Sequence, residues 1–96
     1  MKKEYHEDTG ATWVSFEAGQ PFDASLHSTP FWRCKVGYMY SEYDKVYCVY
    51  SVQVVGIGWV DDKVTRETEM KSLREVVHLL NYLQDLETYY DKVYGE

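Results

Sequence analysis

Residues 31–41 read FWRCKVGYMYS, and their side chains alternate in polarity. The even positions from Trp32 to Tyr40 are all aromatic, aliphatic or cysteine, whereas two of the odd positions carry the charges of Arg33 and Lys35. An alternation with a period of two predicts a β-strand that buries one of its faces. We therefore expect a covering layer on the apolar face.

The next strand is predicted at residues 46–59, after a polar turn at residues 42–45. Valine and tyrosine are frequent in it, which is typical of strands. If the apolar even positions of both strands share one face, Tyr40 lies opposite Val46. The odd positions then form a second face, on which aromatic, basic and amide side chains are interleaved.

The C-terminal third of the chain has the period of an amphipathic helix. Thr68 or Ser72 provides an N-cap, and Gly95 ends the helix. With the rotation of an α-helix, one face is apolar. Its residues are Val76, Leu79, Leu80, Leu83, Leu86, Tyr90 and Tyr94. We expect this face to cover the even face of the sheet.

These elements predict one α+β domain at residues 11–96, after a flexible leader at residues 1–10. The predicted fold is a three- to four-stranded antiparallel sheet packed against one long C-terminal amphipathic helix. Residues 11–17 add a strand, and residues 64–66 form either a short strand or the approach to the helix. The loop at residues 18–30 either covers the second face or leaves it open. The expected core consists of Trp32, Val36, Tyr38, Val52, Val54, Leu80 and Leu83.

The formal net charge of −6 argues against a free nucleic-acid binder. No apolar run approaches the ~20 residues of a membrane span, and the N-terminus lacks the apolar segment of a signal peptide. We therefore expect a cytoplasmic protein, in which Cys34 and Cys48 are reduced and buried. In the register given above, the two thiols share a face without being direct partners.

No arrangement of residues predicts catalysis, a cofactor site or a metal site. His6, His27 and His78 fall in the leader, a loop and the helix, and they lack the spacing of zinc ligands. Gly56 and Gly58 lack the third glycine of a dinucleotide-binding turn and instead predict a bend in the strand. We therefore expect a protein that is not an enzyme.

Glu87 is unusual because its carboxylate falls within the apolar helix face. A buried carboxylate is costly unless it is paired or hydrogen-bonded. One interpretation pairs Glu87 with a tyrosine hydroxyl or a basic residue of the sheet. We favour the other, in which the helix extends beyond the sheet and Glu87 meets water or another chain. A helix of ~22 residues is ~33 Å long and exceeds a strand pair of ~8 residues.

The second face of the sheet is the predicted partner-binding surface, because tyrosine, arginine and methionine are common at protein interfaces. Its candidate residues are Arg33, Lys35, Met39, Tyr47, Val49 and Gln53. The candidate residues for acidic contacts with a basic groove are Asp61, Asp62, Glu67, Glu69 and Glu75.

In size and acidity the chain resembles small inhibitors of nucleic-acid-processing enzymes, including phage anti-defence and anti-CRISPR-like proteins. We therefore expect it to bind a protein partner, such as an enzyme with a basic groove, and to inhibit or modulate it. The same surface is also suited to a homodimer. The alternative function is a nucleic-acid-binding module that uses the aromatic and basic sheet face. The surplus of acidic residues counts against that alternative.

Overall fold

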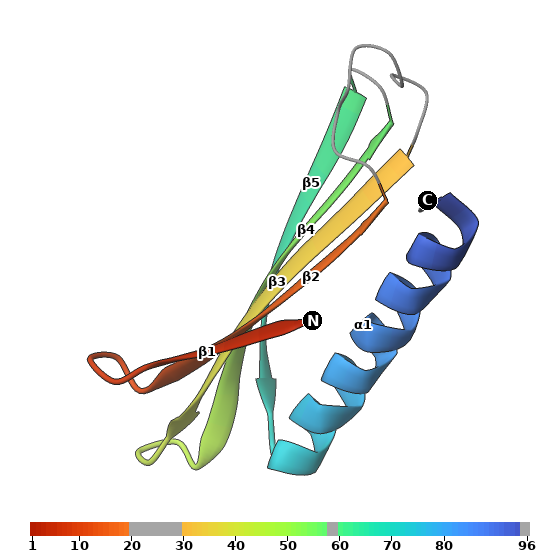
Figure 1. Ribbon diagram of the computed structural model, residues 1–96. Coiled ribbons are helices and arrows are strands. Elements are labelled where there is room, and N and C mark those ends of the chain that lie inside the picture. The colour runs from red at the N-terminus through yellow and green to blue at the C-terminus, as the bar shows by residue number, and fades with distance from the viewer. Residues whose placement is uncertain (20–29, 58–59, 95–96) are drawn as a thin grey trace.

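A five-stranded antiparallel sheet and a C-terminal helix form the fold (Figure 1). The structure is a computed structural model and describes residues 1–19, 30–57 and 60–94. The elements are β1 (Lys2–His6), β2 (Ala11–Gly19), β3 (Pro30–Ser41), β4 (Val46–Ile57), β5 (Val60–Met70) and α1 (Leu73–Tyr94). Each strand pairs with the next strand in the sequence. The predicted α+β fold is confirmed, but the sheet has five strands where three to four were predicted.

The two edge strands account for this difference. Residues 2–6, expected in a flexible leader, form β1 and pair with β2, with Lys2 opposite Ser15. Gly10 closes the turn between them with a positive φ of 75° and donates its N–H to the carbonyl of His6 at 2.8 Å. At the other edge, β5 extends far beyond the short strand predicted at residues 64–66. All described side chains of these strands except Met70 are exposed, so neither strand needs an apolar alternation.

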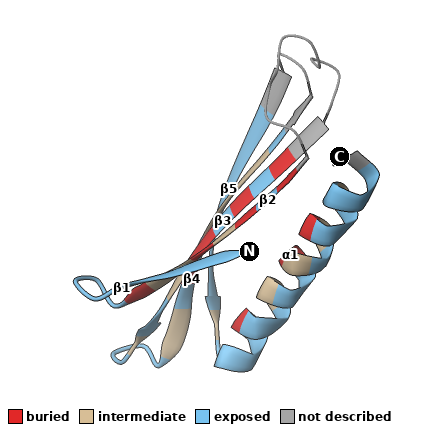
Figure 2. Cartoon of the chain, viewed as in Figure 1, coloured by how far each residue is buried: buried red, intermediate tan, exposed pale blue. Residues whose placement is uncertain are grey.

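Helix α1 lies along one face of the sheet and packs mainly against β2 and β3 (Figure 1). The buried positions are concentrated on β2, β3 and the helix face toward them (Figure 2). The core cluster consists of Val14, Phe16, Ala18, Trp32, Cys34, Val36, Val49, Val76 and Leu83. At one end of this layer, the indole of Trp32 stacks on the ring of Tyr90, with 5.7 Å between centroids and 7° between planes.

The register of the β3–β4 hairpin differs from the predicted one by one residue. Tyr40 lies opposite Tyr47, not opposite Val46. The cause is the loop, which has four residues between the paired Ser41 and Val46. Its last residue, Lys45, has a φ of 55° and donates its N–H to the carbonyl of Ser41 at 2.7 Å. The even positions of β3 therefore share a face with the odd positions of β4.

This register changes part of the expected core. Trp32, Val36 and Leu83 are buried as expected, and Tyr38 and Leu80 are partly buried. Val52 and Val54 instead lie on the face away from α1, where both are partly buried. Their place toward the helix is taken by odd positions of β4, above all Val49, which is 3% exposed.

The N-terminal end of α1 follows the predicted capping pattern. The hydroxyl of Ser72 accepts the N–H of Glu75 at 3.3 Å, and the carboxylate of Glu75 accepts the N–H of Lys71 at 2.9 Å. Thr68, the alternative N-cap, lies within β5. The predicted helix end at Gly95, the bend at Gly58 and most of the loop at residues 18–30 lie outside the described residues.

The register also separates the two cysteines. Both are free thiols, as expected, but only Cys34 is buried. Cys48 is exposed on the opposite face of the sheet. Burial raises the pKa of the Cys34 thiol to about 11, so little reactive thiolate forms there near neutral pH.

A thiol titration of the native protein should therefore detect one reactive cysteine, and titration after unfolding should detect both. A chromogenic disulfide reagent measures this directly. Cys48→Ser should remove the native signal, whereas the matched variant Cys34→Ser should keep it. A native protein in which neither thiol reacts would show that Cys48 is in the core, as the register predicted from the sequence requires.

Candidate functional site

The face of the sheet opposite α1, here called the outer face, carries the candidate site. Strand pairing brings its outward side chains into rows that cross the sheet. The first row is Glu17, Arg33, Val54 and Lys63, and the second is Lys2, Ser15, Lys35, Val52 and Thr65. The third row is Glu4, Trp13, Gly37, Tyr50 and Glu67, and the fourth is His6, Ala11, Met39, Cys48 and Glu69.

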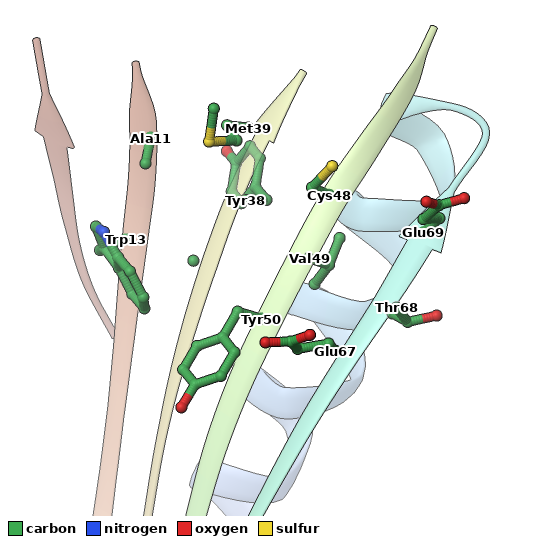
Figure 3. Close-up of a pocket in the computed structure, with 11 residues that line it drawn as sticks. Ala11, Trp13, Tyr38, Met39, Cys48, Val49, Tyr50, Glu67, Thr68 and Glu69 are labelled. Atoms are coloured by element: carbon green, nitrogen blue, oxygen red, sulfur yellow. The ribbon is translucent and has the colours of Figure 1, made fainter. Parts of the chain in front are cut away.

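An aromatic contact occupies the centre of the outer face. The ring of Trp13 lies so close to Gly37 that a Cβ atom on this glycine would meet it at 2.6 Å. Tyr50 meets Trp13 edge-on, with 6.3 Å between ring centroids. Beside them is a shallow hollow of about 480 Å³, which Met39 and Glu67 also line (Figure 3). Gly37 thus allows a large ring to lie flat on the sheet.

The charged residues of the outer face are separated by sign. Lys35 places its Nζ 5.2 Å from the centroid of the Trp13 ring, in a cation–π contact. Nearby, the Nε of Arg33 lies 3.7 Å from a carboxylate oxygen of Glu17. Glu67 and Glu69 follow Tyr50 and Cys48 across the sheet on the edge strand β5. Within residues 1–19, 30–57 and 60–94, no cation lies at ion-pair distance from either carboxylate.

The six residues predicted for partner binding do not share one face. The residues on the outer face are Arg33, Lys35 and Met39, as expected. The register turns the other three residues toward α1, and these are Tyr47, Val49 and Gln53. The prediction of a single surface was therefore wrong for half of its members. The reason is the one-residue difference in the hairpin, which exchanges the two faces of β4.

The three residues that face α1 have structural contacts. Val49 is part of the buried core, and Tyr47 packs against that core from its edge. The side-chain oxygen of Gln53 accepts a hydrogen bond of 2.7 Å from the indole N–H of Trp32. This bond satisfies the polar atom of a large buried ring. These residues hold the fold together and leave the outer face to other side chains.

The outer face gains residues that the sequence analysis did not assign to it. These are Trp13, Cys48, Tyr50, Val52 and Val54. Most come from β4 and follow from the corrected register. For Trp13, the signal in the sequence was the alternation of Trp13 and Ser15 with Val14 and Phe16, which places the tryptophan opposite the buried face of β2.

The five carboxylates predicted for acidic contacts are dispersed. Glu67 and Glu69 lie together on the outer face, whereas Asp62 occupies an opposite-facing position of the same strand. Glu75 lies at the start of α1 and accepts the N–H of Lys71. Asp61 of β5 pairs with Gly56, and its side chain is not described. Two of the five therefore belong to the candidate site.

Glu87 is buried, with 7% of its surface exposed, so the predicted overhang of the helix is wrong. One carboxylate oxygen accepts hydrogen bonds from the N-terminal ammonium of Met1 at 2.8 Å and from the amide of Gln84 at 3.0 Å. The other oxygen accepts the backbone N–H of Glu17 at 2.8 Å. The alternative interpretation, a buried and paired carboxylate, is the one observed, although its partners are neither tyrosine nor a basic side chain. Glu87 connects α1 to β2.

A second hollow, of about 420 Å³, lies between α1 and the strands β4 and β5. Val49, Leu79 and Leu83 form part of its lining, and the exposed Tyr82 also lines it. This hollow is on the helix side of the sheet and continues into the core. It marks the region where α1 no longer covers the sheet.

No protein-family model matches the chain, and the searches found no similar curated protein or solved structure. The described ranges contain no group of histidine, cysteine, aspartate or glutamate side chains arranged to hold a metal ion. Among the same residues, no helix combines the length and the hydropathy that a membrane crossing requires.

Replacing Glu87 with glutamine should lower the free energy of unfolding by about 1–3 kcal/mol, because one acceptor oxygen becomes a donor that faces other donors. Urea denaturation followed by circular dichroism measures this loss. Asp85→Asn removes an exposed carboxylate from the same helix and should change stability by less than ~0.5 kcal/mol. Equal effects of the two substitutions would contradict the buried position of Glu87.

Proposed function

We propose that this chain is a non-enzymatic protein-binding domain whose interface is the outer face of the sheet. The observation that supports this proposal is a strip of aromatic and aliphatic side chains that no described residue covers. Within it, Met39 is 41% exposed and Tyr50 is 36% exposed. Trp13, Val52 and Val54 extend the strip and are partly buried. Contiguous apolar surface with charged residues around it is typical of protein interaction sites.

The side chains of the strip are also held in place before a partner binds. Its residues come from β2, β3 and β4, whose backbones are paired along most of their length. The Trp13 ring is held between Gly37, Tyr50 and the ammonium of Lys35. A surface that is already fixed loses little conformational entropy on binding. This favours recognition of a folded partner by shape and apolar contact.

The geometry favours apolar contact over mimicry of nucleic acid. A phosphate mimic needs several carboxylates in one row, but Asp62 and Glu75 lie away from Glu67 and Glu69. Inhibition or modulation of a nucleic-acid-processing enzyme, as expected from composition, remains a prediction. If the chain acts in this way, the outer face would bind the enzyme through its apolar strip.

Nucleic-acid binding is the second candidate, because aromatic rings and basic side chains share the outer face. Trp13 and Tyr50 resemble stacking residues, and Lys35 lies beside them. Glu4 and Glu67 lie in the same row as these rings and would repel phosphates. A filter-binding assay with single-stranded RNA and DNA at low salt should therefore show no retention.

Site-specific photo-cross-linking tests the proposed interface. A benzophenone amino acid in place of Met39 should form adducts with protein in source-cell lysate or with the purified chain. The matched control carries the same amino acid in place of Tyr89, which is 56% exposed on α1, and should form none. Adducts only from position 89, or adducts with nucleic acid, would contradict the proposal.

A further inference from the structure

The geometry points to a second copy of this chain as the partner that the outer face binds, an inference that rests on the proposed function. Two copies would pack with their outer faces together and be related by a two-fold axis.

The outer face has two halves of opposite charge. The first two rows, here called the basic half, carry four cations and one carboxylate, a net charge of +3. The last two rows, the acidic half, carry three carboxylates, a net charge of −3 with histidine counted as neutral. The cations are Lys2, Arg33, Lys35 and Lys63, and the carboxylates are Glu4, Glu17, Glu67 and Glu69. All eight are exposed.

This arrangement is self-complementary. A two-fold axis that lies in the interface and crosses the strands between the second and third rows reverses the strand direction of the copy. The basic half of one chain then lies over the acidic half of the other, and the reverse contact forms at the same time. Opposite potentials therefore meet twice in one symmetric interface.

The neutrality of the face matters because the chain as a whole is acidic. The described charged side chains of the outer face sum to zero, whereas the chain carries −6. Two copies that meet through another surface would bring excess carboxylates together. Two outer faces meet without this repulsion, and the remaining acidic groups stay in water.

The apolar strip runs through all four rows, from Val54 in the first to Met39 in the fourth. It therefore crosses the two-fold axis and supplies the apolar centre of a symmetric interface. The five strands have 5, 9, 12, 12 and 11 residues, and their average of about 10 residues corresponds to ~33 Å, while the sheet is ~19 Å wide. The face therefore offers ~600 Å², which is at the lower limit of standard interfaces, about 1,200 Å² for both partners together. A basic partner would match the acidic half alone and would be repelled by the basic half.

Charge-swap variants test the inference by analytical ultracentrifugation between ~1 and ~500 µM, a range that resolves dimers with micromolar dissociation constants. One variant combines Glu67→Lys and Glu69→Lys, and the other combines Arg33→Glu and Lys35→Glu. Each variant alone places like charges against each other and should weaken dimerisation at least about tenfold. An equimolar mixture should form a mixed dimer that is tighter than the dimer of either variant alone, because halves of opposite net charge then meet in both contacts, +3 against −3 in one and +1 against −1 in the other.

The control variant combines Glu42→Lys and Asp85→Lys, which are exposed positions outside the outer face. It changes the net charge as much as the Glu67 and Glu69 pair and should dimerise like the wild type. Circular dichroism establishes that each variant is folded.

A wild-type chain that is monomeric throughout the range would overturn the inference. A dimer that survives either charge swap, or a mixture that does not restore it, would also overturn the inference. If the chain is monomeric but position 39 cross-links to a different protein, the proposed function stands, and that protein is the partner that the outer face binds. If position 39 forms no protein adduct at all, the proposed function fails as well.

Discussion

The pairing of Tyr40 with Tyr47 determines most of what this molecule exposes. A four-residue loop closes the β3–β4 hairpin, and it directs the odd positions of β4 toward α1. Val49 then enters the core, while Tyr50, Val52 and Val54 project from the other side. A shift by one residue would exchange these sets. The loop thereby creates both a buried layer and an exposed apolar strip.

One helix cannot cover a sheet of this width. A helix is ~10 Å across, and five strands span ~19 Å. α1 packs mainly against β2 and β3, and Glu87 fixes it to β2 through the N–H of Glu17. The polar edge strands β1 and β5 flank the sheet, and charged side chains on edges hinder aggregation by strand addition. Exposed apolar surface is thus concentrated on the outer face, where the proposed interface lies.

The elements with a buried face could be predicted from the sequence, and the polar ones could not. The alternation from Trp32 to Tyr40 and the period from Val76 to Tyr90 both reflect burial, so they identified β3 and α1. The described side chains of β1 are all exposed, and those of β5 nearly all. Both strands form through backbone pairing, which leaves little pattern in the polarity of their side chains. The turn at residues 42–45 was placed correctly, but the register was inferred from the apolar even positions of both strands, and valine is common on both faces of β4. For that reason three of the six predicted partner-binding residues lie on the outer face and three face α1.

Nuclear Overhauser contacts between backbone Hα protons of β3 and β4 test the account most directly, because they report the register without reference to side chains. The observed register predicts close Hα pairs at every second position among the observed partners, such as Gly37 with Tyr50 or Tyr38 with Val49. Contacts of Tyr38 with Cys48 and of Tyr40 with Val46 would contradict it. They would return Val52 and Val54 to the helix side and remove the apolar strip from the outer face.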